Sequence, residues 1–213
     1  MATAAHNCSV YYTGTSTAVA GEACSVVTGT GGLVYQITDA AKRIIDPSQT
    51  VTVYKAGADV TSTVAINYLF GQITFGVDPA PDAITIDVNY LPRHEITNAR
   101  EFSVSFASDI VDTTVFNGDA ARKKIQTLID ASGSLTSYEA ALTDYGGGQL
   151  SDWFTDGASK VLEFGLVDET VRCWATVESL EPSAAVDGVV ELSVGWTLDA
   201  QLAGTVAFGF LAT

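Results

Sequence analysis

Positive charge is scarce in this chain of 213 residues, which has 10 lysines and arginines against 25 acidic residues and a net charge of −15. Residues 1–95 carry 8 acids and 4 bases, a balance of −4, and the remainder carries 17 and 6, a balance of −11. Proteins that hold nucleic acid neutralise its phosphates with basic stripes. The composition therefore argues against a nucleic-acid clamp. It fits plain solubility, and it equally fits a surface that must not hold DNA.

Histidine and cysteine are also rare. His6 and His94 are the two histidines, and because neither has a ligand partner at metal-site spacing, we expect both to be solvated. Cys8, Cys24 and Cys173 cannot all pair with one another and lack the spacing of a zinc site. We therefore expect reduced, structural cysteines in a protein that folds in a cytoplasm.

A membrane or targeting segment is not indicated. Residues 1–21 contain no charged side chain, but they are mostly Ala, Thr, Ser and Gly, with no basic start and no apolar core. This pattern is neither that of a signal peptide nor that of a spanning helix. We expect no membrane association.

Signatures of catalysis are missing as well. The sequence has no Gly-x-Ser-x-Gly elbow, and the glycine-rich run at 28–32 lacks the Lys-Ser/Thr of a phosphate-binding loop. The pairs Asp109 with Asp112 and Asp152 with Asp156 could act as paired carboxylates or an oxygen cage, but an exposed loop and a solvated helix face explain them better. We expect no catalytic residue, no metal site and no cofactor, and therefore not an enzyme.

Strict alternation of apolar and polar residues dominates the second half of the chain. It predicts strands at 101–107, 129–138, 162–166, 171–177 and 192–198. Trp153 and Trp196 fall on apolar faces and are expected in the core. Trp174 falls opposite Cys173, so it faces either a partner or a ligand.

The remaining segments show weaker patterns. Residues 38–45 and 149–156 predict short helices, whereas 119–130 fits a helix or a strand. A β meander is predicted over 51–90, with alternating strands separated by Gly and Pro turns. The fold class is therefore mainly β: an antiparallel β sandwich or barrel with one short helix, plus an N-terminal β meander. We place the domain boundary between 95 and 96, with 1–95 either separate or integrated with the core.

The order of parts in the C-terminal half resembles the major tail (tail tube) proteins of long-tailed bacteriophages. The residues that carry the resemblance are 102–116, 130–137 and 177–197, which include a strand ending in Ser-Gly-Ser-Leu and a terminal hairpin. The resemblance implies a virion structural protein without a cofactor. Its hexameric rings would stack head to tail around a channel, through which DNA passes without specific binding, and it would meet other phage tail proteins.

The resemblance also implies roles for particular residues. The polar excursion from Asp109 to Lys124 would bridge rings, using Asp109, Asp112, Arg122, Lys123 and Lys124. Independently of the resemblance, the apolar C-terminal segment would be an aggregating edge in water, so we expect Phe208 and Phe210 to be paired in the sheet or laid on a neighbouring subunit. Two alternatives remain open: another phage virion β protein, such as a decoration or connector protein, and an extracellular adhesive or carbohydrate-binding sandwich. The latter would require an exposed aromatic platform that includes Trp174.

Overall fold

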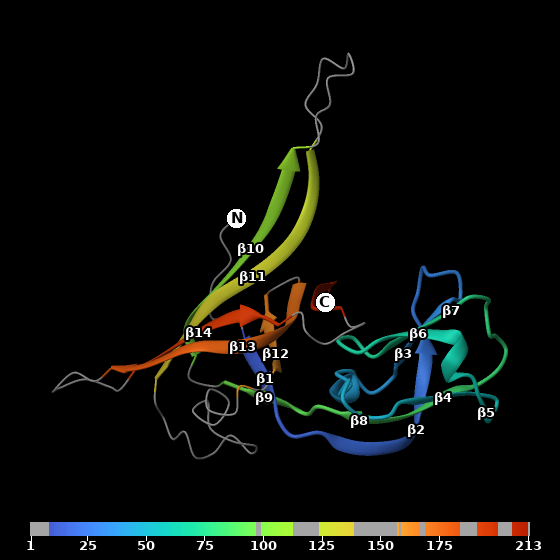
Figure 1. Cartoon of the computed structure of the whole chain (residues 1–213). Coiled ribbons are helices and arrows are strands. Elements are labelled where there is room, and N and C mark those ends of the chain that lie inside the picture. The colour runs from blue at the N-terminus through green and yellow to red at the C-terminus, as the bar shows by residue number, and fades with distance from the viewer. Residues whose placement is uncertain are drawn as a thin grey trace, which may run out of the picture.

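A computed structural model describes residues 9–96, 99–112, 124–138, 157, 159–166, 169–183, 191–199 and 206–212. These residues form two antiparallel β-sheets, sheet A and sheet B (Figure 1). The predicted fold class, mainly β and antiparallel, is confirmed.

Sheet A has eight strands in the order β10-β11-β14-β13-β12-β1-β9, with β15 also paired to β13. Most of its strands come from the C-terminal half, where alternation predicted them. The strands are β1 (Ser9–Thr13), β9 (Arg93–Glu95), β10 (Ala99–Asp112), β11 (Lys124–Tyr138), β12 (Lys160–Gly165), β13 (Glu169–Ser183), β14 (Glu191–Leu198) and β15 (Phe208–Ala212).

One face of sheet A, its inner face, carries the core that alternation predicted. The inner residues of β12, β13 and β14 lie at every second position, and β1 and β11 complete the cluster. Trp196 is 1% exposed and stacks against Phe164 at a ring-centroid distance of 5.5 Å. Trp196 is thus a core residue, as predicted, while Trp153 lies outside the described residues.

Sheet B has seven strands in the order β5-β4-β8-β2-β3-β7-β6. Each predicted strand of the 51–90 region is present, but the strands do not all pair in chain order. β8 pairs with β4 and β2, and β7 is not its neighbour in the sheet. Long-range pairing with β2 therefore decides the sheet order. The strands are β2 (Thr17–Val26), β3 (Val34–Ile37), β4 (Thr52–Lys55), β5 (Ala58–Asp59), β6 (Val64–Asn67), β7 (Gln72–Phe75) and β8 (Ile84–Tyr90).

Helical structure is sparse among the described residues, which contain two 3₁₀ turns, η2 (Ala40–Lys42) and η3 (Thr61–Thr63). The helix predicted over 38–45 is reduced to η2, which Asp39 caps by accepting a hydrogen bond from the Ala41 amide at 3.0 Å. The helix predicted over 149–156 lies outside the described residues.

The β10–β11 hairpin corrects one prediction. Residues 109–112 and Lys124 were expected in a polar excursion, yet Asp112 pairs with Lys124 and Val111 with Ile125. Backbone hydrogen bonds between the two strands are independent of side-chain polarity, so the ladder continues past the end of the apolar alternation. The ambiguous segment 119–130 is a strand from Lys124 onward, and its first part lies outside the described residues.

The hairpin also extends well past the rest of sheet A. β14 pairs with β11 over residues 132–138, so the part of the hairpin beyond Ser132 has no strand partner among the described residues. We call this part, residues 105–112 and 124–131, the arm. It projects away from the rest of sheet A and from sheet B (Figure 1).

Candidate assembly surface

The outer face of sheet A changes character along its length. Over β10, β11, β14 and the second half of β13 it is open and polar, and we call this region the serine-rich face. Its side chains alternate with the core residues of the same strands and are exposed or half-buried. They are Glu101, Ser103, Ser105, Asp130, Ser132, Ser134, Thr136, Thr176, Ser179, Glu181, Glu191, Ser193 and Thr197.

Close packing of these strands explains their small residues. Ser103 and Ser134 face each other across β10 and β11 with their Oγ atoms 2.9 Å apart. On the core side, a Cβ at Gly133 would meet the Ser103 carbonyl and the indole of Trp196. On the outer side, a Cβ at Gly195 would lie 2.5 Å from Ser179 Oγ. Glycine at both positions therefore permits close approach of neighbouring strands.

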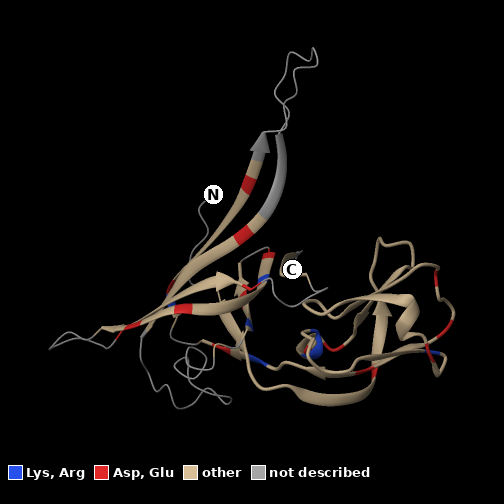
Figure 2. Cartoon of the chain, viewed as in Figure 1, with Lys and Arg blue, Asp and Glu red and all other residues tan. Residues whose placement is uncertain are grey.

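The charge of the serine-rich face is mostly negative. Glu101, Asp130, Glu181 and Glu191 lie on it, and acidic positions recur along the described hairpin and β13 (Figure 2). Arg100, which lies at a register shift of β10, pairs with Glu191 through Nη1 and Oε1. A surface with this charge balance repels the phosphates of a polyanion.

Two long strand edges border this face. Among the described residues, β10 pairs with β11 alone, and β13 past Ala175 pairs with β14 alone. Both edges therefore present backbone N–H and C=O groups that have no ladder partner in the described part of the chain. Edges of this kind are templates for pairing with another chain.

The arm carries an apolar stripe. Phe106, Ile110 and Ile129 are 40%, 60% and 48% exposed. Register places Phe106 and Ile129 on the same side of the hairpin as Phe102 and Leu135, and Ile110 lies just past a register shift. The stripe thus continues the core face of sheet A beyond the core. An exposed apolar surface on a projecting ribbon is typical of a contact with another chain.

The other half of the outer face is covered by sheet B. Val161 and Trp174 pack against Ile44, Leu69 and Phe70, which come from sheet B and its connections. Trp174 is therefore 2% exposed and packs within its own chain, which corrects the expectation that it faces a partner or a ligand. It cannot form an exposed aromatic platform, so the carbohydrate-binding alternative loses its required feature.

A buried ion cluster accompanies this contact. Glu163 accepts hydrogen bonds from Arg172 Nε at 2.6 Å and from Arg93 Nη1 at 2.7 Å. Arg172 also donates to the Leu69 carbonyl at 3.1 Å, and its guanidinium lies 5.4 Å from the centre of the Phe70 ring. Burial lowers the pKa of Arg172, and the Glu163 carboxylate opposes this shift.

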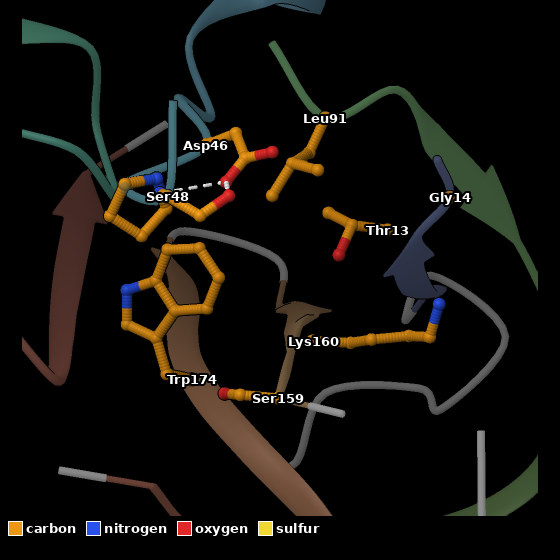
Figure 3. Close-up of a pocket in the computed structure, with 9 residues that line it drawn as sticks. Thr13, Gly14, Asp46, Ser48, Leu91, Ser159, Lys160 and Trp174 are labelled. Carbon is orange, nitrogen blue, oxygen red and sulfur yellow. Dashed lines mark hydrogen bonds between the residues drawn. The ribbon is translucent and has the colours of Figure 1, made fainter. Parts of the chain in front are cut away.

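A groove of about 310 Å³ lies beside the contact between the sheets, and Figure 3 shows the residues around it. Thr13 and Lys160 line it from sheet A, and Asp46 and Ser48 from the connection before β4. Asp46 Oδ1 accepts bonds from the Ser48 amide at 2.9 Å and from the Ser48 hydroxyl at 2.6 Å. Trp174, which is 2% exposed, forms one side of the groove.

Cys24, Cys173 and His94 are the cysteines and the histidine in the described part of the chain. No cluster of three or more metal-ligating side chains occurs there. Burial raises the pKa of the Cys173 thiol to about 12. Burial, and after it the neighbouring Glu22, raises the pKa of the Cys24 thiol to about 12, and both cysteines are unpaired. His94 differs from expectation, because its Nε2 is buried and its ring lies 5.6 Å from that of Tyr12.

The predicted contact residues are only partly accounted for. Asp109 is exposed on β10, Asp112 ends β10, Lys124 begins β11, and Arg122 and Lys123 lie outside the described residues. The two C-terminal aromatic residues are in β15, within the chain's own sheet A. Phe208 is half-buried and Phe210 is 50% exposed.

The serine-rich face was missed by the sequence analysis, although its signal is present. Serine or threonine alternates with apolar or glycine residues at 103–105, 132–136 and 193–197. The apolar positions of this alternation indicate the core face. Its polar positions indicate a second, open face.

No protein-family description and no curated protein matches this sequence. Two solved structures are similar to it, each at 18% identity and a TM-score of 0.45. One, described as the tail of an empty gene transfer agent particle with C6 symmetry, covers 57% of this chain and 87% of its own. The other, from the virion of a native gene transfer agent particle, covers 56% of this chain and 89% of its own. At this distance the function has to be inferred from the chain's own surfaces.

Within the described residues, no helix has the length and apolar character needed to cross a membrane.

Proposed function

We propose that this chain is the structural subunit of a phage-like tail tube, in which hexameric rings stack head to tail around a channel for DNA. The observation that carries the proposal is the serine-rich face, a polar and acidic β surface bordered by two strand edges that have no partner among the described residues. The family resemblance of residues 102–116, 130–137 and 177–197 falls on the strands that form this face and on the sequence between two of them.

The two edges supply a ring contact. Because β10 and the second half of β13 lie on opposite sides of the four-stranded region, the β10 edge of one copy meets the β13 edge of the next. Such a contact is heterologous: it joins two different surfaces, and it closes into a ring when the rotation between copies permits. Pairing also satisfies the backbone groups that the isolated chain leaves to water.

Ring closure of this kind turns the serine-rich faces of all copies toward the axis. Hydroxyl groups hydrate the channel wall, and Glu101, Asp130, Glu181 and Glu191 repel the DNA backbone. DNA therefore passes without specific binding. The arm points away from the ring plane and brings its apolar stripe, with Arg122, Lys123 and Lys124, to the next ring.

Cysteine cross-linking tests the ring contact. Ser105→Cys on β10 combined with Glu181→Cys on β13 should give covalent multimers on oxidation. The control pair, Ser132→Cys with Ser193→Cys, lies on the two inner strands β11 and β14 of the same face and should give none. Negative-stain microscopy of the same samples should show rings, and tubes at high concentration.

Three other results would contradict the proposal. Equal cross-linking of the two pairs would remove the edge contact, and a strictly monomeric protein at high concentration would remove the tube. A closed assembly that never stacks would favour the decoration or connector alternative.

A further inference from the structure

Strand β15 is a short strand held on both of its faces. It pairs with β13 from Glu169 opposite Ala212 to Cys173 opposite Phe208. It continues the line of β14 along the same edge of β13, because Trp174 donates to the Ala207 carbonyl at 2.8 Å and accepts from the Asp199 amide at 2.9 Å. β15 therefore lies between the base of the arm and sheet B.

On one face, β15 is in contact with sheet B. A Cβ at Gly209 would lie 2.5 Å from Cε2 of the Phe70 ring, so the ring fits against this strand only because position 209 is glycine. Arg172 is directly opposite Gly209 in register, and its guanidinium covers the same Phe70 ring. The Leu69 carbonyl, next to Phe70, accepts the hydrogen bond from Arg172.

On its other face, β15 holds the base of the arm. The ring centre of Phe106 lies 5.2 Å from that of Phe208 and 5.4 Å from that of Phe210. Phe106 pairs with Ala131, one residue beyond the last β11 position that pairs with β14. The aromatic cluster therefore lies where the arm leaves the support of sheet A.

We propose that β15 is a brace that couples the docking of sheet B to the direction of the arm. Beyond Phe106 the two arm strands pair only with each other among the described residues, so side-chain contacts at the base set the direction of the ribbon. Phe208 and Phe210 supply these contacts, and Phe70 holds the opposite face of the same strand. A shift of sheet B thus moves β15 and, through it, Phe106.

In a tube, this coupling would let the docking of sheet B regulate the stacking of rings through the arm. This consequence rests on the proposed function. The coupling itself does not require assembly. It is therefore measured on dilute, monomeric protein, where failure of the brace and failure of the tube are separate results.

Spin labels measure the coupling in one direction. Labels at Ala107→Cys on the arm and Ala23→Cys on β2 are introduced in a chain that carries Cys8→Ser and Cys24→Ser, with the buried Cys173 retained. The parent should give one narrow distance distribution by pulsed electron resonance. Gly209→Ala, which displaces Phe70, should broaden or shift it. The control, Gly76→Ala, adds a Cβ with nothing within 4 Å and should leave the distribution unchanged.

Hydrogen exchange measures the opposite direction. Coupling between two sites is reciprocal, so Phe106→Leu at the arm base should accelerate amide exchange at residues 68–71 of the sheet B connection. The expected acceleration is several-fold, and Ile110→Leu, on the same stripe but away from β15, should produce none. This second variant keeps the test decisive if Gly209→Ala lowers the yield of folded protein.

Either of two results overturns the brace. In the first, Gly209→Ala gives the same distance distribution as Gly76→Ala. In the second, Phe106→Leu changes exchange in the arm alone, which would mean that β15 touches both regions without linking them.

Discussion

Strand β13 passes through two environments along one face, and the contrast between them explains much of this molecule. Arg172 and Trp174, in its first half, lie under sheet B and are 3% and 2% exposed. Ser179 and Glu181, in its second half, point outward from the same face and meet solvent. A charged residue is buried in one half and small hydroxyl groups are open in the other. The polarity of an outward residue therefore does not by itself reveal whether it is covered.

The two halves satisfy their polar groups differently. Arg172 is held by the Glu163 carboxylate and the Leu69 carbonyl, so its charge is paired away from water. In the open half, hydroxyl and carboxylate groups need no protein partner because water supplies one. The covered half consequently contributes to stability, whereas the open half is free to serve assembly.

Removal of the carboxylate from the covered half should have the largest effect on stability. Glu163→Gln leaves the buried Arg172 without its counter-charge, and the loss of one partner of a buried pair costs about 3–5 kcal/mol. Urea unfolding followed by tryptophan fluorescence measures this loss. The matched control in the open half, Glu181→Gln, should change the free energy of unfolding by less than about 0.5 kcal/mol. Equal losses would show that the two halves of β13 do not differ as described.

Two glycines allow a comparison between the core side and the outer side of the neighbouring strands β11 and β14. Gly133→Ala should cost about 1–3 kcal/mol, because its Cβ meets a backbone carbonyl and the Trp196 indole, which cannot easily move. Gly195→Ala should cost less, because its Cβ meets the Ser179 hydroxyl group, which can rotate toward solvent. Thermal unfolding of the two variants ranks them, and a larger effect at Gly195 would contradict the assignment of faces.

Charge reversal on the serine-rich face should change DNA affinity with little effect on folding. The parent should bind duplex DNA negligibly at physiological salt, because its net charge is −15. Asp130→Lys with Glu181→Lys should create salt-sensitive binding in an anisotropy assay, while each substitution shifts stability by less than about 0.5 kcal/mol. Micromolar, salt-sensitive binding by the parent itself would contradict a DNA-repelling channel wall.

The smallest effect on folding is expected for the basic cluster between β10 and β11. Reversal of Arg122, Lys123 and Lys124 to Glu should change stability by less than about 0.5 kcal/mol and yet prevent rings from stacking. Each contact is worth only about 0.2–1 kcal/mol, but it is repeated in every subunit of a ring junction. Circular dichroism and measurement of tube lengths at low and high salt test this. Tubes as long as those of the parent would exclude the inter-ring role, and unfolding would show that the segment belongs to the core.

The sequence by itself determined the five strands from β10 to β14 and the core positions that they carry. Alternation at Leu192, Val194 and Trp196 has a period of two, which is a local property of an extended chain, so the inward residues could be read directly. The paucity of basic residues likewise set the sign of the open surface.

Only the tertiary structure decided which outward residues are covered. Alternation from Val171 to Val177 places Trp174 outward, and residues about 100 positions earlier in the chain, such as Leu69, cover it. The same alternation would place Glu181 inward, but the register shift between Val177 and Ser179 turns it outward. The insertion of β8 between β4 and β2, and the extension of β10 to Asp112, are also products of pairing. Backbone hydrogen bonds between distant segments leave no local pattern in the side chains, so these features could be found only in the folded chain.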